Sequence, residues 1–164
     1  MKTLFIMRHA KSNWDDAKLA DLERPLNERG MRTAPIMGKF MRERGIEPSI
    51  IISSPAVRAK ETAELVKEAA NFSTDLKFDE RIYEASARTL LQVVSEIDDT
   101  CRTAMLVGHN PGIEGSIRLL TGDMEPMPTA ALAVIELNID RWYETVDGCG
   151  RSEGVFRPKD LTFL

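Results

Sequence analysis

Both histidines of this chain of 164 residues follow short apolar segments. His9 comes after residues 3–7 and Arg8, and His109 comes after residues 104–107 and a glycine. Short apolar segments that stop at turn residues are typical of buried strands. Ligands of open α/β sheets bind beyond the carboxyl ends of such strands. The two histidines are therefore expected at a functional site.

An imidazole beside a guanidinium is suited to phosphoryl transfer. At pH 7 an unperturbed histidine is mostly neutral, so one ring nitrogen of His9 is free to attack phosphorus. The planar fork of Arg8 matches phosphate oxygens. His109 precedes an expected helix, where it could donate to the transferred group or neutralise it as a cation. The alternative for each histidine is a structural polar residue, but the pair together favours the catalytic interpretation.

A further cation follows a sharp turn. Residues 49–53 are predicted to form a buried strand, Ser54 and Pro55 a turn, and residues 56–70 a helix. Arg58 then lies in the first helical turn, from which its side chain can fold back over the end of the sheet. Backbone N–H groups at this helix start could also attract an anion. Taken alone, Arg58 would be interpreted as a solvated helix residue; beside two strand-end histidines it is a candidate phosphate ligand.

Phosphoryl transfer also benefits from a proton donor or acceptor. Glu84 follows Tyr83 in the loop before an expected helix and is one candidate. Three aspartates of the polar segment 11–25 compete for this role, namely Asp15, Asp16 and Asp21. Most of these loop carboxylates are expected to be solvated surface charges, and the sequence leaves the choice open.

The composition argues against several other classes of protein. The formal net charge of −4 gives no general attraction to nucleic acid or to a membrane surface. No apolar stretch reaches the roughly 18 residues of a transmembrane helix. The chain has no nucleotide-binding glycine loop, H-E-x-x-H motif, cysteine cluster or G-x-S-x-G elbow, so no metal and no cofactor is expected. The first strand begins almost at the N-terminus and the two cysteines are isolated, which favours a reduced, cytoplasmic protein over one with a Cys101–Cys149 disulfide.

The pattern along the chain predicts an α/β fold in one domain, residues 1–164. Strands that alternate with helices indicate a mostly parallel, helix-covered sheet. The last two strands are predicted to form an antiparallel pair at its edge, joined at Asp140, and residues 156–161 an exposed tail or last edge segment. The long polar segment 11–25 is expected to be functional. The predicted elements are strands at residues 3–7, 49–53, 76–78, 103–107, 131–139 and 142–146, and helices at residues 27–44, 56–70, 90–97 and 113–120.

Four short motifs occur in an order that resembles the histidine phosphatase superfamily, which also contains cofactor-dependent phosphoglycerate mutases. Arg-His-Ala at residues 8–10 is similar to the Arg-His-Gly motif that closes the family's first strand. Residues 53–62 are similar to its Ser-Ser-Pro-x-x-Arg-Ala-x-x-Thr pattern, residues 24–30 to the segment before its first long helix, and residues 107–110 to its second histidine motif. The short chain, the Gly-His-Asn-Pro-Gly loop and residues 156–161 look most like the SixA-type phosphohistidine phosphatases.

The resemblance implies a three-layer α/β/α sandwich of the phosphoglycerate mutase type and a covalent mechanism. His9 would attack phosphorus and become a phosphohistidine. Arg8, Arg58 and His109 would bind the phosphoryl oxygens and stabilise the in-line transition state, mainly by positioning and electrostatics. Water would then hydrolyse the intermediate, and no metal is implied because the arginines take its place.

Further site residues follow from the same resemblance. Ser12 and Asn110 would make minor contacts in the phosphate pocket. Glu84 falls where larger members place their acidic residue, on which SixA-type members rely less, since an imidazole is a better leaving group than an alkoxide. Ala10 stands where the family has glycine, so the backbone after His9 must avoid conformations that only glycine adopts cheaply, which indicates a distinct loop path.

The leading hypothesis is a phosphatase that removes phosphate from a histidine of a protein. A short chain has few insertions with which to enclose its site, so a protein loop can enter. The alternative is a small-molecule phosphomonoesterase with the same nucleophile; mutase activity is less favoured because it requires a closed pocket. A non-catalytic phosphohistidine-binding protein is the third hypothesis. The sequence leaves the partner protein and the oligomeric state open.

Overall fold

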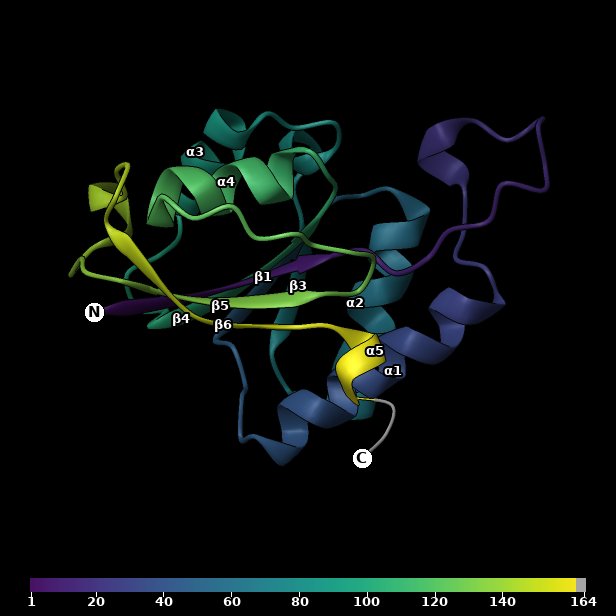
Figure 1. Cartoon of the computed structure of the whole chain (residues 1–164), viewed down its shortest axis with the longest axis horizontal. Coiled ribbons are helices and arrows are strands. Elements are labelled where there is room, and N and C mark those ends of the chain that lie inside the picture. The colour runs from purple at the N-terminus through teal and green to yellow at the C-terminus, as the bar shows by residue number, and fades with distance from the viewer. Residues whose placement is uncertain (162–164) are drawn as a thin grey trace.

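A central sheet organises the computed structural model, which describes residues 1–161 (Figure 1). Its strands are β1 (Lys2–Arg8), β2 (Ile50–Ser53), β3 (Asp75–Phe78), β4 (Thr103–Gly108), β5 (Leu132–Leu137) and β6 (Gly150–Phe156). Their spatial order is β3-β2-β4-β1-β5-β6. The first four are parallel to one another, whereas β5 is antiparallel to both β1 and β6. The prediction of a mostly parallel sheet with an antiparallel edge is therefore confirmed.

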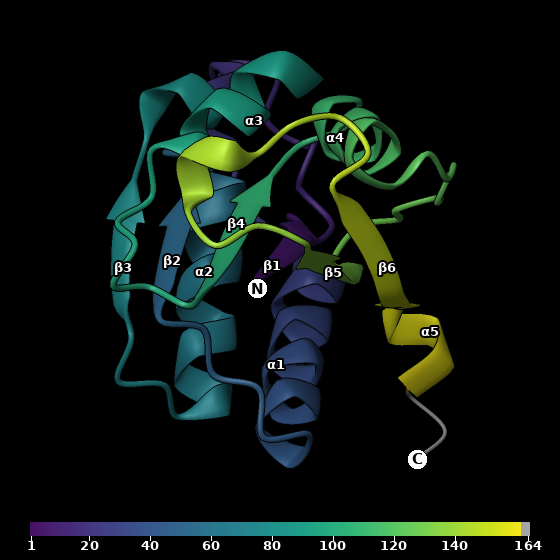
Figure 2. The same ribbon diagram turned by 90° about the vertical axis from the view of Figure 1, so that its left-hand side faces the viewer.

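Helices cover both faces of this sheet (Figures 1 and 2). One face carries α1 (Glu28–Glu43), α2 (Val57–Ala70) and, beside α1, the short α5 (Pro158–Leu161), while α3 (Ala87–Ser95) and α4 (Gly112–Thr121) cover the other. Alternate side chains of β1 point into the two cores. Leu4 and Ile6 pack in the core under α3 and α4, and Phe5 and Met7 in the core above α1 and α2. The predicted three-layer α/β/α sandwich is confirmed.

The predicted strand at residues 142–146 is wrong. These residues form a 3-10 helix, η3 (Trp142–Glu144), and its continuation. Trp142 is fully buried there, whereas Tyr143 and Val146 are exposed, so their apolar character did not mark a strand. The partner of β5 is instead β6, whose polar and glycine-rich sequence hides the strand pattern. Residues 156–161, predicted as a tail or edge segment, contain the end of β6 and the short α5.

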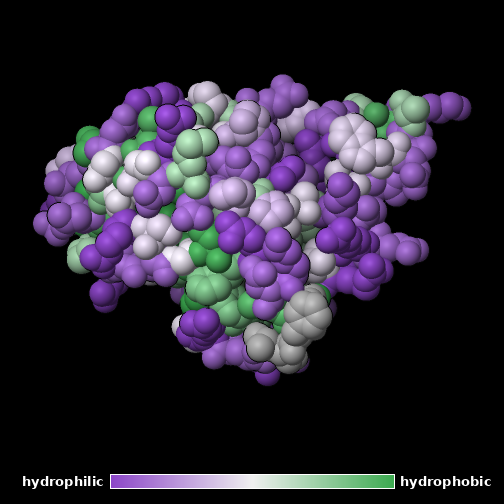
Figure 3. All heavy atoms as spheres, in the orientation of Figure 1, coloured by the Kyte–Doolittle hydropathy of each residue, from purple (hydrophilic) through white to green (hydrophobic). Residues whose placement is uncertain are grey.

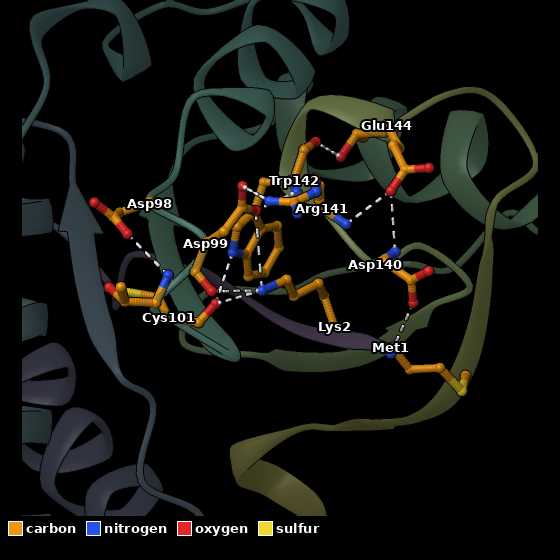
Figure 4. Close-up of polar contacts among 11 residues, drawn as sticks. Met1, Lys2, Asp98, Asp99, Cys101, Asp140, Arg141, Trp142 and Glu144 are labelled. Carbon is orange, nitrogen blue, oxygen red and sulfur yellow. Dashed lines mark hydrogen bonds and ion pairs between the residues drawn. The ribbon is translucent and has the colours of Figure 1, made fainter.

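A buried lysine secures the amino end of the sheet (Figure 4). The Nζ atom of Lys2 donates to the carbonyl oxygens of Asp99 and Cys101 at 2.9 and 3.1 Å. It also lies 5.6 Å from the centre of the Trp142 ring, whose Nε1 donates to the same Cys101 carbonyl at 2.8 Å. These contacts join β1, the segment before β4 and η3 at the end of the sheet that is remote from the histidines.

The structure bears on the two cysteines and on membrane-spanning helices. Cys101 and Cys149 are free and partly buried, so the less favoured disulfide is absent. Within residues 1–161, no helix has the length and apolar character needed to span a bilayer.

Candidate active site

The carboxyl ends of β1 and β4 bring the two histidines together. The strands are parallel neighbours with Arg8 in register with Gly108, so the next residues on each strand are His9 and His109. Their ring centroids lie 5.0 Å apart, with the ring planes inclined by 53°. The two residues are 7% and 9% exposed. Histidines from distant parts of the chain thus form one buried site at the predicted edge of the sheet.

The hydrogen bond of His9 determines which ring nitrogen is free. Its Nδ1 atom lies 2.7 Å from the carbonyl oxygen of Ala10. Because a carbonyl oxygen can only accept, Nδ1 carries the proton and Nε2 keeps a lone pair. Burial lowers the pKa of His9 to about 4, and the charges of Arg58 and Arg8 act in the same direction against the raising effect of the Ala10 carbonyl. His9 is therefore neutral at pH 7, as the prediction of a nitrogen nucleophile requires.

Alanine is accommodated where glycine was expected. Ala10 is fully buried, and its N–H donates to Oγ1 of Thr62 in α2 at 2.9 Å. The non-glycine residues with positive φ among residues 1–161 are Asn71, Glu84 and Ala130, so Ala10 keeps an ordinary backbone. The hydrogen bond to α2 also fixes the chain directly after His9.

Arg58 is part of the buried site. It is 6% exposed, so the interpretation as a solvated helix residue is wrong. The Ser54–Pro55 turn ends β2 and places Arg58 in the first turn of α2, as predicted. Its Nη1 and Nη2 atoms donate to the carbonyl oxygen and to Oδ2 of Asp21 at 2.7 and 2.9 Å.

Three buried side-chain nitrogens have no hydrogen-bond partner in the part of the chain that the structure describes. They are Nε of Arg8, Nε of Arg58 and Nδ1 of His109. Leaving a buried polar group unpaired costs about 1–3 kcal/mol, more for a charged one, so such atoms need an explanation. All three belong to residues predicted to bind one phosphoryl group. An oxyanion between them would supply the missing acceptors.

A serine that the sequence argument did not assign to the site orients His109. Nε2 of His109 lies 2.7 Å from Oγ of Ser54, the residue after β2, which accepts from the N–H of Ala56 at 3.2 Å. Burial, together with the charges of His9 and Arg58, lowers the pKa of His109 to about 3. Without a ligand, His109 is therefore neutral. A bound dianion would raise this pKa and favour the imidazolium form.

The sequence profile of the histidine phosphatase superfamily (branch 1) matches residues 4–106 of the chain. The chain belongs to the histidine phosphatase superfamily. Among solved structures, a protein named as phosphohistidine phosphatase SixA from Agrobacterium tumefaciens superposes with a TM-score of 0.82 at 27% sequence identity, over 96% of this chain and 98% of that one. The prediction of a SixA-type member of this superfamily is thereby confirmed.

Two further comparisons cover nearly the whole chain. The structure of the protein histidine phosphatase SixA with tungstate superposes with a TM-score of 0.80 at 22% identity, over 98% of this chain and 99% of that one, and shows the shared fold. An uncharacterized protein of Mycobacterium tuberculosis is 28% identical over 93% of this chain and 100% of its own length. This histidine phosphatase therefore has the phosphoglycerate mutase-like architecture from end to end of the described residues.

Ser12 and Asn110 follow the two histidines closely in the chain, and their side chains form hydrogen bonds with other protein groups. Oγ of Ser12 accepts from Nη1 of Arg24 at 2.9 Å. Nδ2 of Asn110 donates to Oε2 of Glu114 and to the carbonyl oxygen of Met127, at 2.7 and 3.1 Å. The Met127 carbonyl also accepts from Nη1 of Arg8 at 3.1 Å. Asn110 and Arg8 thus donate to the same Met127 carbonyl oxygen. Direct contact of Ser12 or Asn110 with phosphate stays a prediction.

Glu84 lies near the site with an exposed side chain. Its backbone is left-handed, with φ of 54°, which for a non-glycine residue costs on the order of 1–3 kcal/mol and is found most often at functional sites. The preceding residue, Tyr83, packs the edge of its ring against His109, with the centroids 5.7 Å apart. A role for Glu84 as proton donor stays a prediction.

Of the three loop aspartates, Asp21 is the one that contacts the predicted site residues. All three side chains are exposed, but Asp21 alone of the three contacts Arg58, Arg24 and Tyr83. The hydroxyl of Tyr83 has the largest part in lowering the pKa of Asp21 to about 2, with Arg24 and Arg58 acting in the same direction. Asp21 is therefore ionised at pH 7 and has no proton to donate. The sequence signal for this group was the family-like segment 24–30, which follows it directly.

No group of three or more histidine, cysteine, aspartate or glutamate side chains within residues 1–161 has an arrangement that could hold a metal ion.

Proposed function

We propose that this histidine phosphatase removes the phosphoryl group from a phosphohistidine of another protein, through a covalent intermediate on His9. The proposal is carried by one observation: buried nitrogens of Arg8, Arg58 and His109 have no partner among the described residues, and the neutral His9, whose ring lies 5.0 Å from that of His109, keeps a free Nε2. The two guanidinium N–H groups, and Nδ1 of His109 when it carries a proton, match the oxygens of a phosphoryl group.

The first step transfers the phosphoryl group to His9. The Nε2 lone pair attacks phosphorus, the new N–P bond forms, and the N–P bond of the substrate breaks. Nε of Arg8 and Nε of Arg58 donate to the equatorial oxygens, and His109, whose pKa rises near the dianion, neutralises charge as the transition state forms. The departing imidazole takes a proton from solvent or from a neighbouring acid.

The second step regenerates the enzyme. Water attacks phosphorus, the N–P bond to His9 breaks, and inorganic phosphate leaves with the oxygen of that water. The hydrogen bond from Nδ1 of His9 to the Ala10 carbonyl persists throughout, so the ring returns to the same tautomer. The arginines act by position and charge in both steps, and each step is an in-line displacement at the same phosphorus.

The leaving group favours a phosphohistidine over an alcohol phosphate. Among the carboxylates, Asp21 is held ionised with a pKa of about 2, and Glu84 is exposed to solvent. Asp21 has no proton to give and Glu84 is not buried, so neither matches the buried acid that helps an alkoxide to leave. An imidazole leaves more easily because its pKa is close to neutrality. The likeness to a protein named as SixA phosphohistidine phosphatase supports the same substrate class.

A small-molecule phosphomonoesterase is the second candidate, and the left-handed backbone of Glu84 favours it. Strain at this position is explained if the carboxylate has to reach a leaving group. In that case Glu84→Gln would abolish turnover of an alcohol phosphate, whereas turnover of phosphohistidine would change little.

The test measures phosphate release from a protein that carries phosphohistidine, beside a panel of phosphomonoesters, with the wild type and Glu84→Gln. We expect faster release from phosphohistidine and less than a threefold effect of Glu84→Gln on it. Faster turnover of an alcohol phosphate, lost in Glu84→Gln, would establish the second candidate. Tight binding of the phosphoprotein without release would indicate a non-catalytic binder.

A further inference from the structure

We propose that Asp21 is a positioning residue of this active site, which holds the outer edge of the Arg58 guanidinium so that Nε of Arg58 faces the phosphoryl group. The inference rests on the proposed phosphatase function and adds a residue to its machinery. Asp21 belongs to η1 (Asp21–Glu23), within a segment that projects from the body of the molecule beside the start of α2 (Figure 1).

The three oxygens of Asp21 contact Arg58, Tyr83 and Arg24. Oδ2 accepts from Nη2 of Arg58 at 2.9 Å and from the hydroxyl of Tyr83 at 2.6 Å. Oδ1 accepts from Nε of Arg24 at 3.1 Å and forms an ion pair with Nη2 of the same residue at 3.0 Å. The backbone carbonyl of Asp21 accepts from Nη1 of Arg58 at 2.7 Å. One residue therefore joins the projecting segment, α2 and the loop before α3.

The two arginines bound to Asp21 differ in whether a side-chain nitrogen remains without a protein partner. Arg24 uses all three of its nitrogens on the protein, because Nη1 donates to Ser12 and to the carbonyl of Asn13. Its guanidinium also stacks on Trp14, 3.3 Å from the ring centre. Arg58 gives both Nη atoms to Asp21 and keeps a buried Nε with no partner. Arg24 is thus a support, and Arg58 is the arginine with a donor available for substrate.

Asp21 leaves this donor available and does not compete for it. A bidentate grip on the two Nη atoms fixes the plane of the guanidinium, since five donors are held in one rigid fork. Because the plane is fixed, the N–H bond of Nε points in one fixed direction. A phosphoryl oxygen can bind there without displacing the carboxylate. The same oxygen of Asp21 also accepts from the hydroxyl of Tyr83, whose ring packs edge-to-face with the ring of His109.

Asp21 and Arg24 are among the residues that attach the projecting segment to the rest of the molecule. The face seen in Figure 3 is largely hydrophilic. The segment carries three exposed large apolar residues, Trp14, Leu19 and Leu22. Trp14 is 70% exposed and stacks on Arg24, so its fluorescence can report on the state of the network.

The experiment compares Asp21→Asn with Asp15→Asn in the whole protein. Asp15 is an exposed aspartate of the same segment and controls for the loss of one negative charge. Three quantities are measured for each variant: kcat and its pH profile, the affinity for vanadate by calorimetry or Trp14 fluorescence, and the thermal unfolding midpoint. Both changes are repeated in an Arg58→Ala background.

We expect Asp21→Asn to lower kcat about tenfold or more and to weaken vanadate binding at least fivefold, because displaced catalytic groups lose much of their effect. The shape of the pH profile should stay as in the wild type. In the Arg58→Ala background the same change should have less than a twofold effect on either quantity, because Asp21 acts through Arg58. Asp15→Asn should resemble the wild type throughout.

Several results would overturn the inference. Activity of Asp21→Asn equal to that of Asp15→Asn would remove any role, and faster turnover or tighter vanadate binding would make Asp21 a competitor of the substrate. Loss of one limb of the pH profile would make it a proton donor. If Asp21→Asn had the same effect in the Arg58→Ala background as in the wild type, Asp21 would not act through Arg58. A wild type that binds vanadate without releasing phosphate would contradict the proposed function, while the vanadate affinities would still decide the role of Asp21.

Discussion

The ring of His109 lies 5.0 Å from the ring of His9, centroid to centroid, because the strands that carry them are parallel neighbours in the sheet. Each ring is fixed from its own side, His9 by the carbonyl of Ala10 and His109 by the hydroxyl of Ser54. Nδ1 of His109 and the Nε atoms of Arg8 and Arg58 are buried and have no hydrogen-bond partner among the described residues. An oxyanion is the ligand that completes this arrangement.

Both histidines should remain neutral far below the pH at which an exposed histidine titrates. Burial lowers the pKa to about 4 for His9 and to about 3 for His109, compared with 6.5 for the free side chain. Imidazole ¹⁵N NMR can follow each ring separately because the chain has two histidines. We expect no protonation of either ring between pH 7.5 and 5.5, and a proton on Nδ1 of His9.

The same spectra give a test of the anion site. Vanadate or inorganic phosphate should raise the pKa of His109, because a nearby dianion stabilises the imidazolium. A ring that titrates near pH 6.5 in the free protein, or spectra that do not respond to either anion, would contradict the described electrostatics.

Removing the side chain of Arg58 should greatly slow phosphate release. Arg58→Ala deletes one donor to the transition state, and the loss of one such donor typically costs about 10²–10³ in kcat. We therefore expect phosphate release at least about 100-fold slower, measured at saturating substrate. Arg88→Ala is the matched control, because Arg88 is exposed on α3 and pairs with Asp147. Near-normal turnover in Arg58→Ala would mean that this arginine has only a structural role.

Lys2 should affect stability without affecting catalysis. Lys2→Met keeps the apolar stem but removes the Lys2 donor from the carbonyl oxygen of Asp99, while the carbonyl oxygen of Cys101 keeps the bond from Trp142. An unsatisfied buried acceptor costs about 1–3 kcal/mol, so the free energy of unfolding in urea should fall by about 2 kcal/mol. The rate of phosphate release should be unchanged, since Lys2 lies at the opposite end of β1 from His9.

Lys39→Met is the control for Lys2→Met because Lys39 is exposed on α1. An equal loss of stability in both variants, or a loss of activity in the folded Lys2→Met protein, would show that the buried contacts of Lys2 do not have the assigned role.

The sequence predicted the parts of the site that strand ends and turns determine. His9 and His109 follow apolar strands, and Arg58 follows a Ser-Pro turn, so local pattern and sheet topology were enough to bring them together. The parallel order of the central strands followed from their alternation with helices.

The parts that failed depend on contacts between distant residues. β6 was missed because a polar edge strand carries little hydrophobic alternation, and residues 142–146 were misassigned because Trp142 is buried by the far end of the sheet. Ser54 reaches His109 from the end of the neighbouring strand, and Asp21 reaches Tyr83 from a segment 62 positions earlier in the chain. No local pattern records such pairs.

The central claim is that His9 carries the phosphoryl group, and the most direct test traps it there. The wild type is mixed with a phosphohistidine-bearing protein, quenched within milliseconds at alkaline pH, where phosphohistidine is stable, and mapped by mass spectrometry. We predict one phosphate on the peptide that contains His9, none on the peptide that contains His109, and neither intermediate nor phosphate release in folded His9→Ala. Phosphate release by His9→Ala, or a phosphate trapped on His109, would contradict the account.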